Sequence, residues 1–218
     1  MTEFTKIKLD DPFDPPAPKT GRPARPKDAA TLILVRGGRE VLMGQRSAGH
    51  VFMPDKWVFP GGRVDPGDAT APAATEFPAA TEALLRHNGV RRPPRAFGLA
   101  ATRETLEETG LRVGGPEGPA LDRLAFICRA VTPPYRPRRF DARFFLAKAE
   151  EVLASDKPEA GEELLSIRWF SLEDAEALDL PSITRFVLGE VRARLAGEPV
   201  APAYLRWTRG AHRLDRLS

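Results

Sequence analysis

The chain has 218 residues, 42% of them hydrophobic, with 33 Lys and Arg against 30 Asp and Glu and a formal net charge of +3 at pH 7. This length fits one domain with additional segments at its ends. The apolar content suffices for an ordinary core, so a disordered or fibrous chain is excluded. A charge excess this small, without a long basic run, suits anionic small molecules and gives no reason to expect a nucleic-acid partner.

One cysteine and the lack of a long apolar stretch bear on the compartment. Cys128 lies in an apolar run and has no second cysteine to pair with, so we expect a buried thiol and a cytoplasmic protein. The longest apolar stretch, residues 29–35, is far shorter than the ~20 residues that span a bilayer, so no membrane partner is expected. The acidic amino terminus does not resemble a secretion signal.

The two ends are expected to flank the folded domain. Residues 1–28 contain six prolines and almost no apolar periodicity, which is typical of an extended arm. We expect a domain over residues 29–198 and a tail over residues 199–218.

The domain begins with strand patterns. Residues 29–35 and 40–46 are apolar runs joined by a glycine turn, which predicts a β-hairpin. A short apolar piece at residues 57–59 then leads into Gly61 and Gly62, where the missing side chains permit close backbone approaches. A loop of special geometry is expected at these glycines.

The rest of the domain mixes helices with strands. Residues 69–95, rich in Ala, Pro and Arg, are interpreted as an inserted surface segment with one short helix near 79–87. A helix is predicted over residues 97–109, where Gly110 stands at the expected end. The remaining predicted elements are strands at 124–131, 143–147 and 166–170 and an amphipathic helix at 183–195. This mixture indicates a layered α/β domain.

Three glutamates of the predicted helix carry the chemistry. Glu104, Glu107 and Glu108 fall at i, i+3 and i+4, so they share one helix face. Like charges at these spacings destabilise a helix, so a divalent cation that neutralises them explains the cluster better. Hard oxygen ligands suit Mg²⁺ or Mn²⁺, and Arg103 can hold one carboxylate in place. A solvated acidic face is the alternative that the glutamates alone leave open.

Residues ahead of this helix complete a longer pattern. Five residues separate Gly62 from the acidic Asp68, and residues 103–111 read Arg-Glu-Thr-Leu-Glu-Glu-Thr-Gly-Leu. Together these segments resemble the signature of the Nudix hydrolase family. Asp68 stands where the family has glutamate, and Thr105 stands where it has an apolar residue. The 34 residues between Asp68 and Arg103 far exceed what the family's pattern places there.

The long segment between the two halves of this signature is a second point of resemblance. A branch of the family similar to the peroxisomal coenzyme A diphosphatases carries a long insertion at this place, here residues 69–95. Residues 45–47, 52–54 and 139–145 look like that branch as well. The resemblance covers about residues 29–190 and implies an α/β/α sandwich around a mixed sheet.

The resemblance also implies a reaction, the Mg²⁺- or Mn²⁺-dependent hydrolysis of a diphosphate linked to another group. The implied metal ligands are the Gly61 carbonyl, Glu104, Glu107 and Glu108, with Arg103 holding a carboxylate. Family members usually add a base or ligand from a later loop. Glu163 is preferred to Glu162 for that role, and a surface role stays open for both.

The substrate is less well marked. Arg46 precedes residues 59–62 at the offset seen in coenzyme A-cleaving relatives, so Arg46 and Gly62 are candidate substrate contacts. An exposed arginine at a strand end is the alternative for Arg46. Arg91 and Arg92 are candidates as well, because they could bind a 3′-phosphate, or they could merely solubilise a loop.

We therefore expect an enzyme whose small-molecule diphosphate substrate is coenzyme A or acyl-coenzyme A. The second hypothesis for an enzyme is an ADP-ribose or nucleotide-sugar diphosphatase. The alternative to an enzyme is a ligand-sensing module without turnover. A homodimer is plausible by resemblance. The three histidines show no zinc-ligand spacing.

Overall fold

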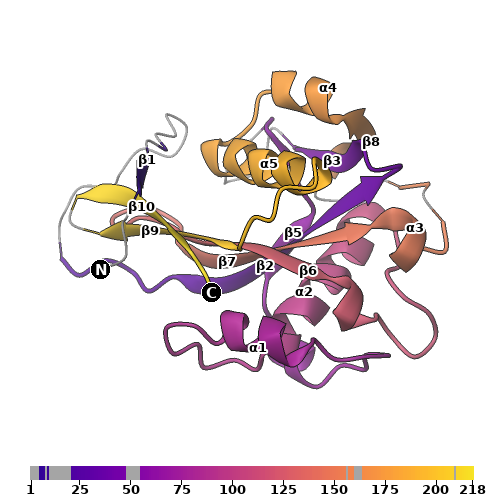
Figure 1. Ribbon diagram of the computed structural model, residues 1–218, viewed down its shortest axis with the longest axis horizontal. Helices are drawn as coiled ribbons and strands as arrows, with labels where there is room; N and C mark the ends of the chain where they lie inside the picture. Colours follow the sequence, from indigo (N-terminus) through magenta and orange to yellow (C-terminus); the bar gives the residue numbers. More distant parts are fainter. Residues whose placement is uncertain are drawn as a thin grey trace.

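The computed structural model describes residues 5–7, 9, 21–47, 55–155, 157–159, 164–208 and 210–218. In this part of the chain a mixed sheet of ten strands lies between helices on both of its faces (Figure 1). The expected α/β/α sandwich with a mixed sheet is therefore confirmed. No helix of the described residues is both long and apolar enough to cross a membrane.

The strands are β1 (Thr5–Ile7), β2 (Lys27–Arg36), β3 (Glu40–Arg46), β4 (Trp57–Val58), β5 (Gly61–Arg63), β6 (Ala125–Val131), β7 (Phe140–Lys148), β8 (Leu164–Ser171), β9 (Ala203–Thr208) and β10 (Ala211–Arg216). The helices are α1 (Ala79–Leu85), α2 (Pro94–Thr109), α3 (Ala149–Val152), α4 (Leu172–Ala177) and α5 (Ser182–Leu195), with short 3₁₀ turns at Pro66–Ala69 and Leu121–Arg123. Every strand and helix predicted from the apolar patterns is present.

The sheet runs in the order β1-β10-β9-β6-β7-β2-β3-β4, with β5 on β2 and β8 on β3. The pairs β2–β7 and β6–β9 are parallel, and the other pairs are antiparallel. The predicted hairpin of β2 and β3 pairs only next to its turn, at Val35 with Val41 and Arg36 with Glu40. Farther from the turn the two strands diverge, and β5 takes the place beside the first half of β2.

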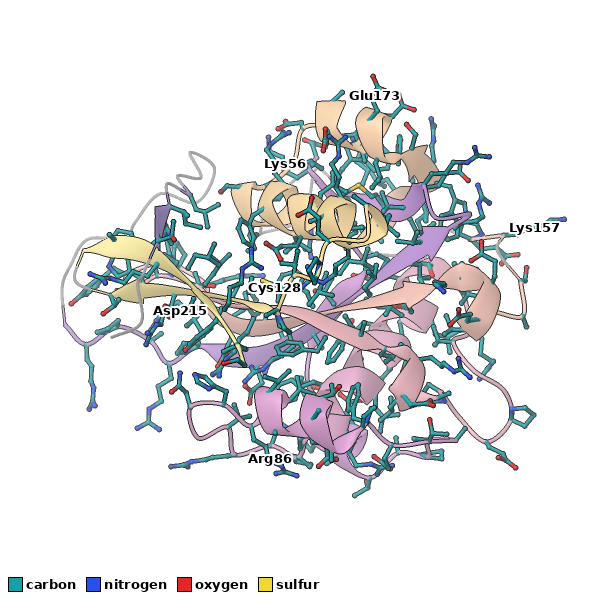
Figure 2. The ribbon with its side chains drawn as sticks, in the orientation of Figure 1. Lys56, Arg86, Cys128, Lys157, Glu173 and Asp215 are labelled. Carbon is teal, nitrogen blue, oxygen red and sulfur yellow. The ribbon has the colours of Figure 1, made fainter. Side chains whose placement is uncertain are left out.

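Two apolar clusters hold the helices to the sheet. On one face Phe97 and Leu99 of α2 pack against alternate residues of β2, and on the other Val187 and Leu188 of α5 do the same. Cys128 lies in the α5 cluster with 0% of its surface exposed, near the centre of the molecule (Figure 2). Burial raises the pKa of its thiol well above the ordinary value, so the prediction of a buried core thiol is confirmed.

The segment 199–218 differs from the expected tail. β9 and β10 form an antiparallel hairpin, and β9 continues the sheet beside β6. From the expected arm, β1 adds a strand to β10, and β2 already begins at Lys27. The sequence signal for these strands is weak because Arg, His and Asp occupy most of β10, which leaves no apolar alternation to detect.

Candidate active site

The acidic face of α2 is set by a helix that ends where the sequence indicates. Gly110 adopts φ 70° and its N–H donates to the carbonyl of Leu106, which stops the helix just after the glutamates. The three carboxylates differ in burial. The Glu107 side chain is 55% exposed and that of Glu104 15%, whereas Glu108 is buried with 3% of its surface exposed.

Strand β5 lies directly against this acidic face. The Gly61 N–H donates to Oε2 of Glu108 at 2.9 Å. A Cβ built on Gly62 would stand 2.4 Å from the carboxylate of Glu104, so only glycine leaves room for that side chain. The expected close approach is thus a contact with α2 at Gly62, and a contact with Ala30 and Thr31 of β2 at Gly61.

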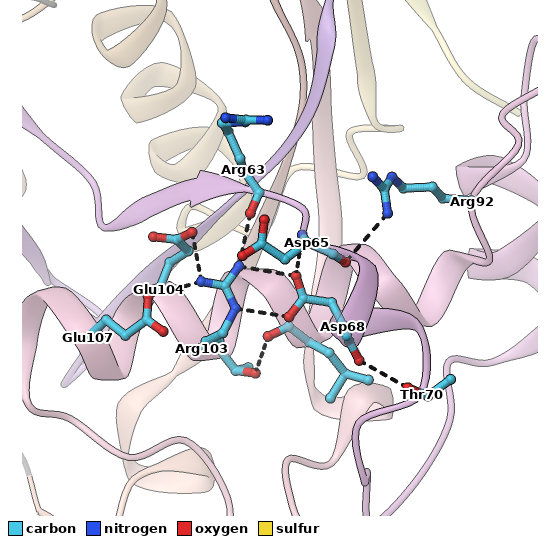
Figure 3. Close-up of polar contacts among 11 residues, drawn as sticks. Arg63, Asp65, Asp68, Thr70, Arg92, Arg103, Glu104 and Glu107 are labelled. Atoms are coloured by element: carbon cyan, nitrogen blue, oxygen red, sulfur yellow. Dashed lines mark hydrogen bonds and ion pairs between the residues drawn. The ribbon is translucent and has the colours of Figure 1, made fainter.

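Arg103 is the centre of a charged cluster (Figure 3). Its guanidinium binds both oxygens of Asp68, at 2.9 and 3.1 Å, and donates to the carbonyl of Arg63. One amino group, Nη1, bridges Glu104 and Glu107 at 2.9 Å each. The hydrogen bond to Asp68 is the largest cause that raises the pKa of Arg103, while burial acts in the other direction.

Asp68 works as an anchor for this cluster. The residue is 4% exposed, and its Oδ2 accepts the N–H of Asp65 at 2.7 Å, which closes the short turn after β5. The aspartate that stands in place of the family's glutamate therefore reaches Arg103 from this turn. It fixes the guanidinium next to Glu104 and Glu107.

A cavity of about 640 Å³ opens beside these residues on the α5 face of the sheet. At one end it is lined by Glu104, Glu107 and Arg103, and at the other by Leu205 and His212 of the β9–β10 hairpin. Two sequence-predicted substrate contacts, Arg46 and Gly62, line the cavity, as does the predicted metal ligand Gly61.

Other predicted site residues are not brought to this cavity. Arg92 is bound to the carboxylate of Asp28 at 3.2 Å and to the carbonyl of Asp65 at 3.4 Å, and neither Arg92 nor the exposed Arg91 is among the lining residues. The structure therefore places both arginines outside the cavity, and their predicted contact with substrate stays a prediction. Arg92 instead ties the segment before α2 to β2. Glu163 lies outside the described residues, as does Glu162.

The carboxylates offer a suitable donor set for a hard cation. Glu104 and Glu107 supply oxygens at the cavity wall. Glu108 lies one helical turn after Glu104, and its carboxylate accepts the Gly61 N–H. The described residues contain no ready-made group of three acidic, His or Cys side chains around one point. Arg103 offsets the charge of Glu104 and Glu107 instead. The donor chemistry fits Mg²⁺ or Mn²⁺, and each of these two carboxylates binds Arg103 through one of its two oxygens.

Two cavity residues were missed by the sequence analysis. Arg63 and Arg138 both line the cavity, and neither guanidinium has a partner among the residues that the structure describes. Figure 3 shows the Arg63 side chain directed away from the Arg103 cluster. The position of Arg63 directly after Gly62 was a signal by which the sequence analysis could have identified it as a cavity residue. Arg138 stands among other arginines of its loop, and the sequence does not distinguish which of them faces the cavity.

The fold and the sequence match known proteins. The NUDIX domain model matches residues 25–75 and 94–188, and no curated protein matches the chain. A NUDIX hydrolase from Alicyclobacillus acidocaldarius superposes with a TM-score of 0.59 at 25% identity, over 82% of this chain and 99% of that one. The NUDIX domain of Shewanella oneidensis NrtR, complexed with ADP ribose, has a TM-score of 0.53 at 14% identity, over 79% of this chain and 90% of that one, and so shares the fold.

Proposed function

Since this chain belongs to the Nudix hydrolase family, which acts on nucleoside diphosphate derivatives, we propose that it cleaves the diphosphate of a nucleotide-containing cofactor. Nudix enzymes generally use divalent metal ions such as Mg²⁺. The observation that carries the proposal is the contact of β5 with α2, in which Gly61 binds Glu108 and Gly62 makes room for Glu104. This contact fixes the carboxylates at one end of a cavity large enough for a cofactor.

Glu104, Glu107 and Glu108 would hold the cation, together with the Gly61 carbonyl. A cation bound there supplies charge for the diphosphate oxygens and makes a bound water more acidic. Arg63 would contact the diphosphate, because it lines the same cavity as Glu104 and its guanidinium has no partner among the described residues. Arg46 would act as a further phosphate contact from the end of β3.

Arg103 keeps the site in place when the cation binds. Besides Glu104 and Glu107 it has three acceptors, namely the two oxygens of Asp68 and the carbonyl of Arg63. The guanidinium can therefore release both glutamates without losing its position. This arrangement makes Arg103 a positioning residue.

The late glutamate stays a proposal. Glu163 would assist as a base or a further ligand. The strand that follows Glu163 in the sequence supports this role. β8 begins at Leu164, and Leu164 pairs with Arg46, which lines the cavity. A Glu163→Gln variant with unchanged turnover would reject this role.

For the substrate we propose coenzyme A or acyl-coenzyme A, with ADP-ribose or a nucleotide sugar as the second candidate. The test is hydrolysis of these compounds and NADH with Mg²⁺ or Mn²⁺, with products identified by mass. Release of 3′,5′-ADP and a phosphopantetheine supports the coenzyme A assignment. Release of AMP and ribose 5-phosphate supports the ADP-ribose one, and no turnover of any compound rejects the enzymatic proposal.

A further inference from the structure

The floor of the cavity is a row of small side chains that crosses the sheet. Ala29 of β2 is in register with Ala142 of β7, Ala142 with Ala130 of β6, and Ala130 with Leu205 of β9. All four line the cavity. Because neighbouring strands lie ~4.8 Å apart, the row extends roughly 14 Å from the strand beside β5 to the β9–β10 hairpin.

Aromatic side chains border this row on both sides. Phe144 and Phe140 lie two residues to either side of Ala142 on β7, so all three share one face of the strand, and both phenylalanines line the cavity. An apolar trough of this kind suits the organic part of a substrate. The diphosphate would lie at the β5 end of the trough, beside Arg63 and Glu104.

A second cationic side chain of the cavity lining comes from the loop ahead of β7. Arg138 lies two residues before Phe140, is exposed, and lines the cavity without a partner among the described residues. The adjacent Arg139 differs, since its guanidinium is bound to the carbonyls of Thr132 and Ala24.

Hydrogen-bonding groups line the same side of the cavity. The Thr132 N–H donates to the carbonyl of Phe140, and the Thr132 Oγ1 accepts the N–H of Phe140. His212 lies on β10 opposite Trp207, two residues beyond Leu205. Thr132 and His212 both line the cavity with Arg138. Arg63 thus stands at the β5 end of the trough, in register with Ala29, whereas Arg138 stands four residues before Ala142 in the loop that leads into β7.

We propose that Arg138 forms a second anion subsite that binds a phosphate monoester carried on the organic part of the substrate, away from the scissile diphosphate. This inference rests on the proposed function and narrows it to substrates with an additional phosphate. A substrate whose only anionic group is a diphosphate next to Arg63 would leave the charge of the Arg138 guanidinium without a counterion in the cavity. A guanidinium can bind a phosphate through two parallel hydrogen bonds.

The test compares coenzyme A with 3′-dephospho-coenzyme A. The wild type should prefer the phosphorylated compound by about tenfold or more in kcat/KM, mainly through KM, because the contact is made in both ground and transition states. Arg138→Gln should lose that preference. The matched control is Arg112→Gln, which removes an exposed charge outside the cavity and should keep it. An equal preference in the Arg138→Gln variant, or none in the wild type, overturns the subsite.

A binding measurement separates this inference from the proposed reaction. Calorimetric titration with 3′,5′-ADP and with AMP reports on the subsite without turnover. Arg138→Gln should weaken the binding of 3′,5′-ADP and leave that of AMP unchanged. Equal weakening of both, no effect on either, or no binding of 3′,5′-ADP to the wild type contradicts the subsite. Absence of hydrolysis with intact, Arg138-dependent binding instead rejects the proposed function alone.

Discussion

The carboxylate of Glu104 on α2 occupies the space that a side chain on Gly62 of β5 would need. A Cβ at position 62 would lie 2.4 Å from that carboxylate. Gly62→Ala therefore has to displace the end of a flexible side chain and no backbone atom. We expect a fall in turnover of at least about tenfold with little change in melting temperature.

Gly67→Ala is the matched control for this substitution. A Cβ at position 67 meets nothing within 4 Å, so both turnover and melting temperature should stay close to the wild-type values. Wild-type activity in Gly62→Ala would show that the place of Glu104 is unimportant for the reaction.

Arg103 is expected to stabilise the fold as well as the site. Arg103→Gln leaves the buried Asp68 without its two charged hydrogen bonds, and loss of a partner from a buried pair costs about 3 kcal/mol. Arg103 is itself 28% exposed, so solvent screening lowers the expected loss in the free energy of unfolding to about 2 kcal/mol, below the range for fully buried pairs. Denaturant titration of the two proteins measures it.

The control for Arg103→Gln is an exposed helical pair. Arg86→Gln removes the contact with Glu82, in which the arginine side chain is 55% exposed, and should change the free energy of unfolding by less than about 0.5 kcal/mol. Equal effects of the two substitutions would contradict an anchoring role for Arg103.

Acid sensitivity is predicted at the contact between α5 and β10. Glu190 is 6% exposed and binds Arg216 through both oxygens and Arg194 through one. Burial alone would raise the pKa of Glu190, but the hydrogen bonds to the two arginines outweigh it, and the pKa lies below the ordinary value of 4.5. The stability that this carboxylate contributes is present above pH 4.5 and is lost as the pH falls through the lowered pKa.

Glu190→Gln should consequently destabilise the protein at pH 7 by about 2 kcal/mol, since two arginines lose their counterion. The variant should also lose less stability than the wild type between pH 5 and pH 3, as measured by denaturant midpoints. Glu173→Gln, at an exposed position of α4, should behave as the wild type does (Figure 2). Parallel pH profiles for Glu190→Gln and the wild type would show that the cluster does not govern acid stability.

The floor of the cavity gives a prediction about substrate size. Ala142→Leu adds three carbons at the centre of the alanine row, on a side chain that lines the cavity. We expect a several-fold rise in KM for the cofactor that the enzyme cleaves, with kcat less affected, because the substituent takes the place of the organic group. Ala177→Leu, exposed at the end of α4, should leave KM unchanged. A wild-type KM for Ala142→Leu would place the organic group elsewhere.

The acidic face of α2 could be predicted because it is a local property. The spacing of Glu104, Glu107 and Glu108 fixes their shared face, and Gly110 marks the end of the helix within a few residues of them. The glycines ahead of the helix were a reliable signal for the same reason, since the need for close approach is encoded at the position itself.

The far wall of the cavity could not be predicted. His212 belongs to a strand whose other positions are mostly charged, so the period of two that identifies a strand is absent. Arg92 was a candidate substrate contact because it belongs to the arginine cluster at the end of the predicted insertion. Its partner, Asp28, lies 64 residues away, and only the paired fold shows which acidic group takes up the charge.

The most direct test of the central claim is the rate of diphosphate cleavage by the wild type and by Glu108→Gln, each measured with Mg²⁺ and with a chelator. We expect that the wild type turns over at least one cofactor of the panel only when the metal is present. Glu108→Gln should be slower by about 100-fold or more, with an unchanged fold by circular dichroism. Wild-type rates in the variant, or full activity in the chelator, would contradict a metal-dependent hydrolase built on α2.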